Sequence, residues 1–337
     1  MKAYEVRETT GLDGLVLNRA RPVEAPGPGQ IVVRMRACAL NYRDQGAIRG
    51  IYGYTKFPVI PLSDGAGEVA AVGAGVSRFK VGDRVASTFF QTWPGGRMPA
   101  DVSRHSLGGM IDGVLCEYAV LSENGAIHIP DALSFEQAAT LPCAAVTAWN
   151  AIVETGKVRA GESVLVLGTG GVACFALAFA RMHGAFVIST SSSDEKLART
   201  RAMGADATVN YTLYPEWQEE VLKLTGGAGV DHVLEVGGAG TLERSMAAVR
   251  PGGSIYVIGA LAGPGSINPR MINRKAIKLQ GIHVGSRDMF AAMNRAIVQS
   301  GFQPVIDRVF PFEDAKAAYA HQQSGNHFGK IVIAGAS

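Results

Sequence analysis

A short glycine-rich stretch between two apolar segments limits the folds open to this chain of 337 residues. Residues 168–173 read Gly-Thr-Gly-Gly-Val-Ala and match the pattern G-x-G-x-x-G/A. An apolar run at 164–167 precedes them, and a helix-like pattern at 172–183 follows and ends at Gly184. The glycines permit a tight turn and let the backbone approach a pyrophosphate, and the helix N-terminus supplies N–H donors. This order predicts a dinucleotide-binding turn; a glycine-rich turn without a ligand is the alternative.

The residues around this turn alternate between strand and helix patterns, which predicts a doubly wound parallel sheet. A capping-box sequence at 134–137 precedes an apolar helical run at 138–153. Further strands are expected at 186–188, 207–209, 231–235 and 254–258, with helices near 194–204 and 242–249. After residue 285 the pattern is mixed, with expected helices at 287–299 and 313–322 and expected strands at 305–310 and 330–333.

The first 130 residues have a different pattern, in which short β segments are separated by glycine and proline. Strands are expected there at 31–36, 67–72, 83–86 and 117–120. Such spacing is typical of an all-β or barrel-like module. We therefore expect an α/β chain in three parts: a β-rich domain at 1–130, a nucleotide-binding domain at 131–284 and a return to the first domain at 285–337.

The charge balance and the cysteine spacing exclude several classes of protein. Lysine plus arginine total 32 and aspartate plus glutamate 29, a net charge of +3, so neither nucleic acid nor an anionic membrane is an expected partner. No apolar stretch reaches the roughly 18 residues that a membrane span needs, and the beginning of the chain lacks the apolar region of a signal peptide. The cytoplasm is the expected location. Cys38, Cys116, Cys143 and Cys174 form no CxxC pair, so reduced, buried thiols are expected.

The end of the second strand of the nucleotide-binding part indicates the choice of cofactor. NAD sites place an acidic residue there, whereas residues 188–193 read Ile-Ser-Thr-Ser-Ser-Ser and the first acid, Asp194, is expected on the next helix. The hydroxyls of Ser191 and Ser192, together with Lys196, would bind a 2′-phosphate that a carboxylate would repel. NADP(H) is therefore the expected cofactor. A solvated lysine on the helix surface is the alternative for Lys196.

Five segments spread along the whole chain carry a further signal: Ala-Leu-Asn-Tyr-Arg-Asp at 39–44, and the segments at 61–69, 79–85, 141–149 and 327–332. They resemble, in this order, the early active-site segment, two barrel signatures, the interdomain helix and the C-terminal strand of the medium-chain dehydrogenase/reductase superfamily. The resemblance implies a GroES-like β-rich catalytic domain plus a Rossmann domain with a doubly wound parallel sheet. It also implies an oxidoreductase with a nicotinamide cofactor, and a homodimer formed through the sheet edges near 254–282.

The positions of the catalytic zinc ligands in this superfamily carry other residues here. Asn41 stands at the position of the first cysteine, Ser63 and Asp64 replace a His-Glu pair, and only Cys143 matches the second cysteine. One thiolate and one carboxylate do not make a good zinc site, and residues 89–115 contain no cysteine for a structural zinc. No metal is therefore expected, and the chain resembles the zinc-free, quinone-oxidoreductase-like branch. Cys143 is expected to be a packed helix thiol.

The resemblance also assigns candidate cofactor contacts position by position. Asn41 would lie near the nicotinamide and the substrate, and Thr147 would offer its hydroxyl to the nicotinamide ribose or ring side. The other candidates are Gly168, Gly170, Gly171 and Val172 at the pyrophosphate, Ser191, Ser192, Lys196 and Tyr211 at the 2′-phosphate, Gly237, Ile258 and Gly259 at the carboxyl edge of the sheet, and Val284, Gly285 and Ser286 at the carboxamide. Alternatives remain: Val172 and Ile258 as core residues, Tyr211 as an unliganded turn aromatic, and Asn41 as a residue that holds a bend.

Hydride transfer without a metal requires hydrogen-bond donors at the acceptor oxygen. The candidate catalytic residues are Asn41 and Tyr54, which can donate, and Asp64, a possible base that is equally well a structural carboxylate. The expected function is NADPH-dependent, zinc-independent hydride transfer to a small apolar substrate, either a quinone or an α,β-unsaturated carbonyl. An alcohol or aldehyde (carbonyl) oxidoreductase is the first alternative. A non-catalytic NADPH-binding protein is the second.

Overall fold

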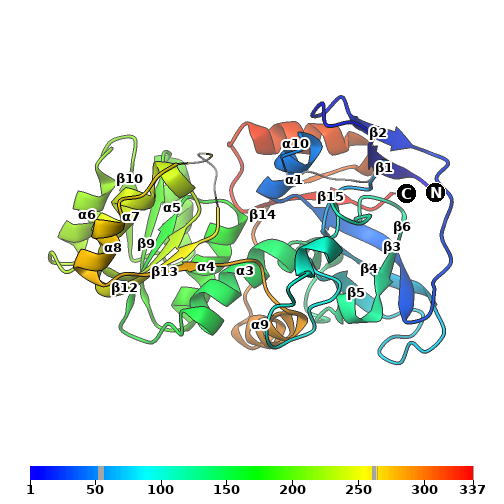
Figure 1. Cartoon of the computed structure of the whole chain (residues 1–337), viewed down its shortest axis with the longest axis horizontal. Helices are drawn as coiled ribbons and strands as arrows, with labels where there is room; N and C mark the ends of the chain where they lie inside the picture. Colours follow the sequence, from blue (N-terminus) through cyan, green and yellow to red (C-terminus); the bar gives the residue numbers. More distant parts are fainter. Residues whose placement is uncertain (52–56, 260–262, 264, 337) are drawn as a thin grey trace. The chain divides into compact units, whose positions relative to one another are not determined.

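The contacts within the chain divide it into two compact units. The computed structural model describes residues 1–51, 57–259, 263 and 265–336. The first unit consists of Met1–Val146 with Gly285–Ser337, and the second unit is Thr147–Val284. Figure 1 draws both units and labels many of their helices and strands. The first boundary differs from the expected one near residue 131, because helix α2 (Phe135–Ala139) packs on strands β3 (Gln30–Ala39) and β4 (Asp64–Val72) of the first unit.

The described part of the first unit is built on a seven-stranded sheet with the order β14-β15-β3-β4-β5-β7, in which β6 also pairs with β3. Only β14 and β15 are parallel neighbours; the other pairs are antiparallel. The remaining strands are β1 (Ala3–Val6), β2 (Leu15–Asn18), β5 (Arg84–Ser87), β6 (Tyr118–Ser122), β7 (Ala126–His128), β14 (Ile306–Phe310) and β15 (Lys330–Ala334). The helices are α1 (Tyr42–Ile48), α2, α9 (Arg287–Ser300) and α10 (Ala315–Gln323).

The register of three neighbouring strands brings together residues that are far apart in sequence. Val332 on β15 lies opposite Ala39 on β3, and Ala39 lies opposite Asp64 on β4. Asn41 follows the end of β3 by two residues, and Lys330 begins β15. The interior of the sheet therefore positions Asn41, Asp64 and Lys330 close to one another.

The described part of the second unit contains a six-stranded parallel sheet with the order β10-β9-β8-β11-β12-β13. Its strands are β8 (Ser163–Leu167), β9 (Phe186–Ser191), β10 (Ala207–Asn210), β11 (Val230–Glu235), β12 (Val249–Val257) and β13 (Lys278–Gly281). Its helices are α4 (Gly171–Met182), α5 (Asp194–Ala202), α6 (Trp217–Leu224), α7 (Leu242–Ala248) and α8 (Pro269–Lys275). The strand order reverses between β8 and β11, where nucleotides bind in sheets of this type. The predicted fold class is confirmed.

The predicted helix at 138–153 is the clearest difference in secondary structure. The observed segment is interrupted at Thr140 and then continues as a π-helical turn (Leu141–Ala145), helix α3 (Val146–Trp149) and a second π-helical turn (Asn150–Thr155). Pro142 lies in the first of these turns. Proline has no N–H to donate and clashes with the preceding turn, so a regular helix cannot run through it. None of the helices in the described ranges is long and apolar enough to cross a membrane.

A pair of leucines in the second unit tests the assignment of the core. Leu165 in the middle of β8 is fully buried, and Leu213 is 64% exposed. We expect Leu165→Ala to lower the free energy of unfolding by about 2–5 kcal/mol, because it leaves a cavity in a packed interior. Leu213→Ala should change it by less than about 0.5 kcal/mol. Denaturant unfolding followed by circular dichroism measures both. Equal losses for the two variants would contradict the assigned core.

Candidate functional site

The glycine turn between β8 and α4 has the geometry that a dinucleotide site requires. Gly168 has a φ of +78°, which favours glycine, and no heavy atom lies within 4 Å of the position that a Cβ would occupy. The Gly168 N–H donates to Thr190 Oγ1 at 3.3 Å. Helix α4 begins at Gly171, and no side chain caps it at Gly170. Its N-terminal N–H groups can therefore bind an anion. A dinucleotide pyrophosphate fits this open, glycine-lined turn.

The end of β9 gathers the residues predicted for a 2′-phosphate. Ser191 is buried, and its carbonyl oxygen accepts a hydrogen bond from the Tyr211 N–H at 3.0 Å. Ser192 is exposed and Lys196 is half-buried in the first turn of α5. The Tyr211 side chain is 42% exposed. These four residues therefore lie around one strand end.

Asp194 begins helix α5, as the sequence predicted. Its Oδ1 accepts a hydrogen bond from Asn210 Nδ2 at 2.7 Å. The carboxylate is thus bound to a neighbouring strand end, β10. No acidic residue occupies the last position of β9, where NAD sites carry one.

A buried glutamate that the sequence reasoning missed organises the loop after β11. Glu235 is fully buried. Its Oε1 accepts hydrogen bonds from the N–H groups of Gly237 at 2.8 Å and Gly238 at 3.0 Å, and from Thr241 Oγ1 at 2.5 Å. Its Oε2 accepts from Ser245 Oγ. An acid at the end of a strand, two residues before a glycine pair, was the available signal in the sequence.

The same glutamate connects the predicted residues of β11 and β12. Its backbone oxygen accepts hydrogen bonds from the Ile258 N–H at 2.9 Å and, at a longer distance, from the Gly259 N–H at 3.4 Å. A Cβ at Gly237 would lie 2.3 Å from Thr241 Oγ1, so only glycine fits the loop without a shift. Because the strands are parallel, Gly168, Gly237 and Ile258 all lie at the carboxyl edge of the sheet.

The three residues predicted at the carboxamide fall on both sides of a unit boundary. Val284 belongs to the second unit, where it has a φ of +52° and its carbonyl accepts from Asn150 Nδ2 at 2.8 Å. Gly285 and Ser286 belong to the first unit, and Ser286 Oγ caps α9 by accepting from the Met289 N–H at 3.2 Å. Thr147, at the beginning of the second unit, is buried.

In the first unit, an ammonium group lies inside a cluster of polar side chains, which we call the Lys330 cluster: Asn41, Asp64, Cys143 and Lys330. Lys330 is 3% exposed. Its Nζ donates to the Leu40 carbonyl oxygen at 2.6 Å and to Asn41 Oδ1 at 2.6 Å, and it lies 3.7 Å from Asp64 Oδ2. The charge of Lys330 is therefore paired with a carboxylate, as a buried ammonium requires.

Asp64 is fully buried and accepts hydrogen bonds through both of its oxygens. Ser63 Oγ donates to Oδ1 at 2.6 Å, and the Cys143 N–H donates to Oδ2 at 3.1 Å. Burial, followed by the negative charge of Asp64, raises the pKa of the Cys143 thiol far above its usual range. Cys143 is therefore a neutral thiol near neutral pH, and Asp64 acts as an anchor within the sheet.

The backbone of Asn41 is held by a second carboxylate. The Asn41 N–H donates to Asp44 Oδ2 at 2.7 Å, and Arg43 Nη1 lies 3.3 Å from Asp44 Oδ1. Burial is the main reason why the pKa of Asp44 is raised to about 6. Both the main chain and the side chain of Asn41 are therefore fixed. The third candidate catalytic residue, Tyr54, lies outside the described residues.

The described side chains of the first unit do not form a set of metal ligands. Among the residues that the structure describes, no group of three or more histidines, cysteines, aspartates or glutamates could hold a metal ion. The Lys330 cluster offers one carboxylate that is already bonded and one thiol whose pKa is raised. A zinc ion does not fit this donor set, because zinc sites use about three protein N, S or O ligands.

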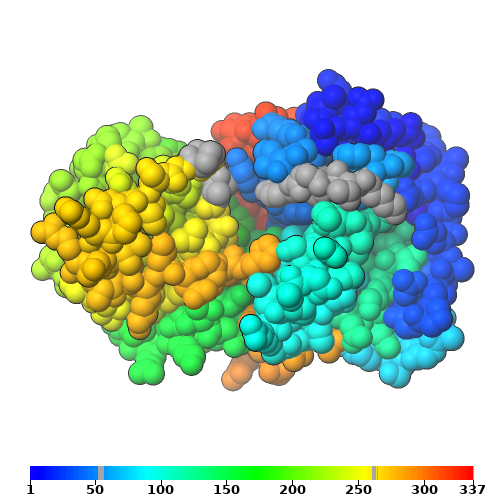
Figure 2. Space-filling view, viewed as in Figure 1, coloured from blue at the N-terminus to red at the C-terminus, as the bar shows by residue number. Residues whose placement is uncertain are grey.

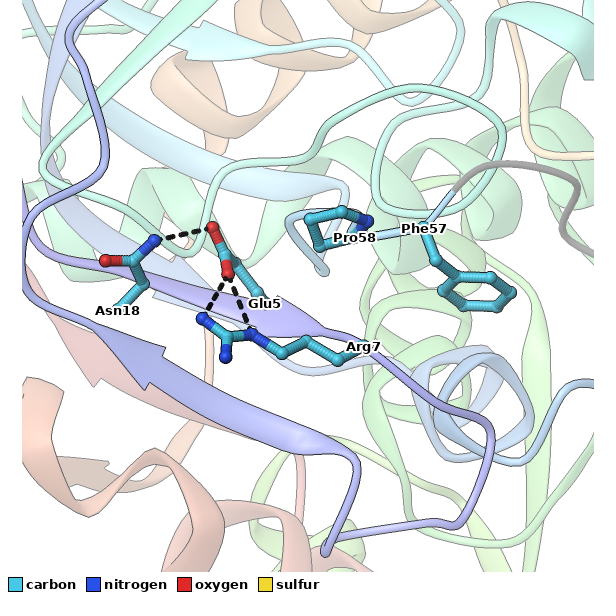
Figure 3. Close-up of a pocket in the computed structure, with 5 residues that line it drawn as sticks. All are labelled: Glu5, Arg7, Asn18, Phe57 and Pro58. Carbon is cyan, nitrogen blue, oxygen red and sulfur yellow. Dashed lines mark hydrogen bonds and ion pairs between the residues drawn. The ribbon is translucent and has the colours of Figure 1, made fainter.

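A separate pocket of about 430 Å³ lies elsewhere in the first unit. Figure 3 shows its lining residues Glu5, Arg7, Asn18, Phe57 and Pro58. Glu5 accepts hydrogen bonds there from Asn18 Nδ2 at 3.0 Å and from Arg7. No residue of the Lys330 cluster lines this pocket.

Comparison with known proteins places both units in one family. Residues 27–131 match the alcohol dehydrogenase GroES-like domain, and residues 171–299 match the zinc-binding dehydrogenase domain. A zinc-type alcohol dehydrogenase-like protein of Schizosaccharomyces pombe is 44% identical over 97% of this chain and 96% of its own length. The quinone oxidoreductase of Rattus norvegicus is 31% identical over 99% of this chain and 97% of its own length.

The solved structures agree with this assignment. The crystal structure of an NAD-dependent alcohol dehydrogenase is 33% identical, covers 99% of both chains and superposes with a TM-score of 0.91. The matched length covers residues of both units. The chain thus belongs to the medium-chain dehydrogenase/reductase superfamily, whose members are oxidoreductases that use nicotinamide cofactors.

Proposed function

We propose that the protein is an NADPH-dependent, zinc-independent oxidoreductase that transfers hydride to a quinone or to an α,β-unsaturated carbonyl. The observation that carries this proposal is the buried ammonium of Lys330 beside Asn41 and Asp64. These two residues stand at positions that hold zinc ligands in the zinc enzymes of the superfamily. A divalent cation there would be repelled by the ammonium of Lys330, and it would find Asp64 and Cys143 as ligand side chains, fewer than the roughly three protein ligands that zinc sites use.

The substrate class follows from the kind of stabilisation that the site can offer. The reduced nicotinamide, when bound, supplies the hydride. Without a Lewis acid, the negative charge that develops on the acceptor must be stabilised by hydrogen-bond donors. Asn41 Nδ2 is a buried donor with no partner among the described residues. Quinones and enones suit such a donor because they delocalise the charge, and water can deliver the proton that completes the reduction.

The proposed catalytic roles divide as follows. Asn41 donates to the acceptor oxygen, and Tyr54 is the proposed second donor. Asp64 is a structural carboxylate in this proposal, because Ser63, the Cys143 N–H and Lys330 already engage its oxygens. Thr147 would contact the nicotinamide from the second unit.

The preference for NADPH rests on the end of β9. Ser191, Ser192, Lys196 and Tyr211 offer hydroxyl and ammonium donors there, and the nearest acid, Asp194, is bonded to Asn210. Gly168, Gly170, Gly171 and Val172 would hold the pyrophosphate, and Gly237, Ile258, Gly259, Val284, Gly285 and Ser286 would line the rest of the cofactor site. A 2′-phosphate gains charge-assisted hydrogen bonds in such surroundings.

Alcohol or aldehyde oxidation is the second candidate function. It is favoured by the 44% identity to a zinc-type alcohol dehydrogenase-like protein and by the similarity to an NAD-dependent alcohol dehydrogenase. The Lys330 cluster argues against it, because a simple aldehyde gains more from a Lewis acid than a quinone does.

We also propose that the protein forms a homodimer through the edge of the sheet in the second unit. Strand β13 ends the strand order, and its Lys278, Gln280 and Gly281 are exposed. Helix α8 has no buried residue. Figure 2 shows the surface around α8 and β13 in gold to orange. An exposed edge strand can pair with a second copy of itself.

Light scattering should give twice the chain mass of 35.4 kDa; the mass of a single chain would contradict the dimer.

The first functional prediction concerns the reaction itself. Purified protein treated with a chelator should oxidise NADPH in the presence of an ortho-quinone or a linear enone, at the rate of untreated protein. A simple aldehyde should react at least about tenfold more slowly, which corresponds to about 1.4 kcal/mol in the barrier. The absorbance of the reduced nicotinamide measures all three rates. Turnover of the aldehyde alone, lost on chelation, would overturn the proposal; NADPH binding with no turnover would favour a non-catalytic role.

The second functional prediction concerns the cofactor. Lys196→Ala should raise the KM for NADPH by about 10–100-fold, because a charge-assisted hydrogen bond contributes about 1.5–3 kcal/mol, and it should leave the KM for NADH unchanged. Lys223→Ala on α6 is the control, since Lys223 is exposed and paired with Glu220. An equal rise for NADPH and NADH would show that Lys196 does not contact the 2′-phosphate.

A further inference from the structure

We infer that Lys330 is a positioning residue for hydride transfer, and that its ammonium orients and polarises the Asn41 amide so that Nδ2 presents a strong donor to the acceptor oxygen. This inference rests on the proposed function and assigns a role to a lysine at the start of a core strand. It is carried by the contacts of Lys330 and by the unpartnered donor of Asn41.

The position of the ammonium is strongly determined by its surroundings. Lys330 Nζ has three hydrogens, and three oxygens lie around it: the Leu40 carbonyl oxygen at 2.6 Å, Asn41 Oδ1 at 2.6 Å and Asp64 Oδ2 at 3.7 Å. Strand β15, which begins with Lys330, pairs with both β14 and β3 inside the sheet. Leaving a buried charge unpaired costs several kcal/mol, so the ammonium cannot easily turn away from these oxygens.

The ammonium also decides which way the Asn41 amide points. An ammonium only donates hydrogen bonds, so the amide atom that faces it at 2.6 Å is the oxygen. The NH₂ group therefore faces away from Lys330. This group is buried and has no partner in the described ranges of the chain. A buried donor without a partner costs about 1–3 kcal/mol, and an acceptor oxygen that reached it would remove that cost.

The same contact strengthens the donor. A positive charge on the oxygen side of an amide withdraws electron density from its nitrogen, and hydrogen bonds in such chains reinforce one another by about 10–30%. Asp44 holds the Asn41 N–H, and Lys330 holds the side-chain oxygen, so the amide has little freedom to rotate. Fixed donors stabilise a developing charge without reorganisation cost.

The experiment is a double-mutant cycle on the full-length protein, with Asn41→Ala, Lys330→Met and the double variant. We expect Lys330→Met to lower kcat for the quinone by about 100-fold, the size of effect that loss of one oxyanion donor produces. In the Asn41→Ala background the same substitution should lower kcat by less than about threefold, because the two residues act as a unit. The dissociation constant of the Lys330→Met variant for NADPH, measured by fluorescence, should change by less than about twofold. Lys330→Arg should recover part of kcat, since it restores a cation.

Two further variants separate positioning from stability. Lys275 also donates to three oxygens, the carbonyls of Met246, Ala247 and Val249, and it lies in the second unit. Lys275→Met should lower the Tm and leave kcat unchanged. If Lys330→Met fails to fold, the variant Asp64→Asn/Lys330→Gln removes both buried charges together, and it should fold with the same deficit in kcat.

The outcomes distinguish the role of Lys330 from the proposed function on which that role rests. The role of Lys330 would be overturned if the losses of kcat in the two single variants added up in the double variant. It would also be overturned if the loss of kcat in Lys330→Met only followed its loss of thermal stability. In both cases the unmodified enzyme would still reduce quinones. Absence of quinone and enone turnover by the unmodified enzyme would overturn the proposed function and this role with it.

Discussion

The contact between Lys330 and the oxygens of Leu40, Asn41 and Asp64 is the interaction on which the organisation of the first unit depends. It joins strand β15 from the end of the chain to β3 and β4 from its beginning. Lys330 is therefore far in sequence from all three of its partners. The cost of burying its charge is offset only when all three partners are in place. The pairing therefore makes the return of the chain to its first unit specific, because Lys330 finds its three oxygen partners only when β15 lies beside β3.

The sequence could predict five of the six described strands of the second unit and three of its helices, because their signals are local. A glycine turn, an apolar strand and a helix follow one another within about 30 residues at 164–183, and each reinforces the same interpretation. The parallel sheet, α4, α5 and α7 were predicted from such patterns. Strand β13 was missed because Lys278, Gln280 and Gly281 are polar or lack a side chain, as suits an edge strand. Its position depends on β12 and not on its own pattern.

The candidate site in the first unit was only half predictable for a physical reason. Asn41 and Asp64 lie in segments that resemble the superfamily, so their positions in the sequence could be assigned. The role of Lys330 could not, because a lysine at the start of an apolar strand reads as a surface residue until the strand order is known. The role of Glu235 could not be predicted for the same reason. Its partners Gly237, Thr241 and Ser245 follow it closely in sequence, but only the folded loop turns them toward one carboxylate.

Lys330 and Glu235 have similar structural roles and opposite charges. Each lies at one end of a buried strand and orders a polar segment whose own sequence does not fix its conformation. Lys330 donates hydrogen bonds to oxygens in the first unit, and Glu235 accepts hydrogen bonds from N–H and O–H groups in the second. A charged group makes stronger hydrogen bonds than a neutral one, so one side chain can hold several partners with little movement. Each of the two buried charges therefore holds the polar segment of its own unit in one arrangement.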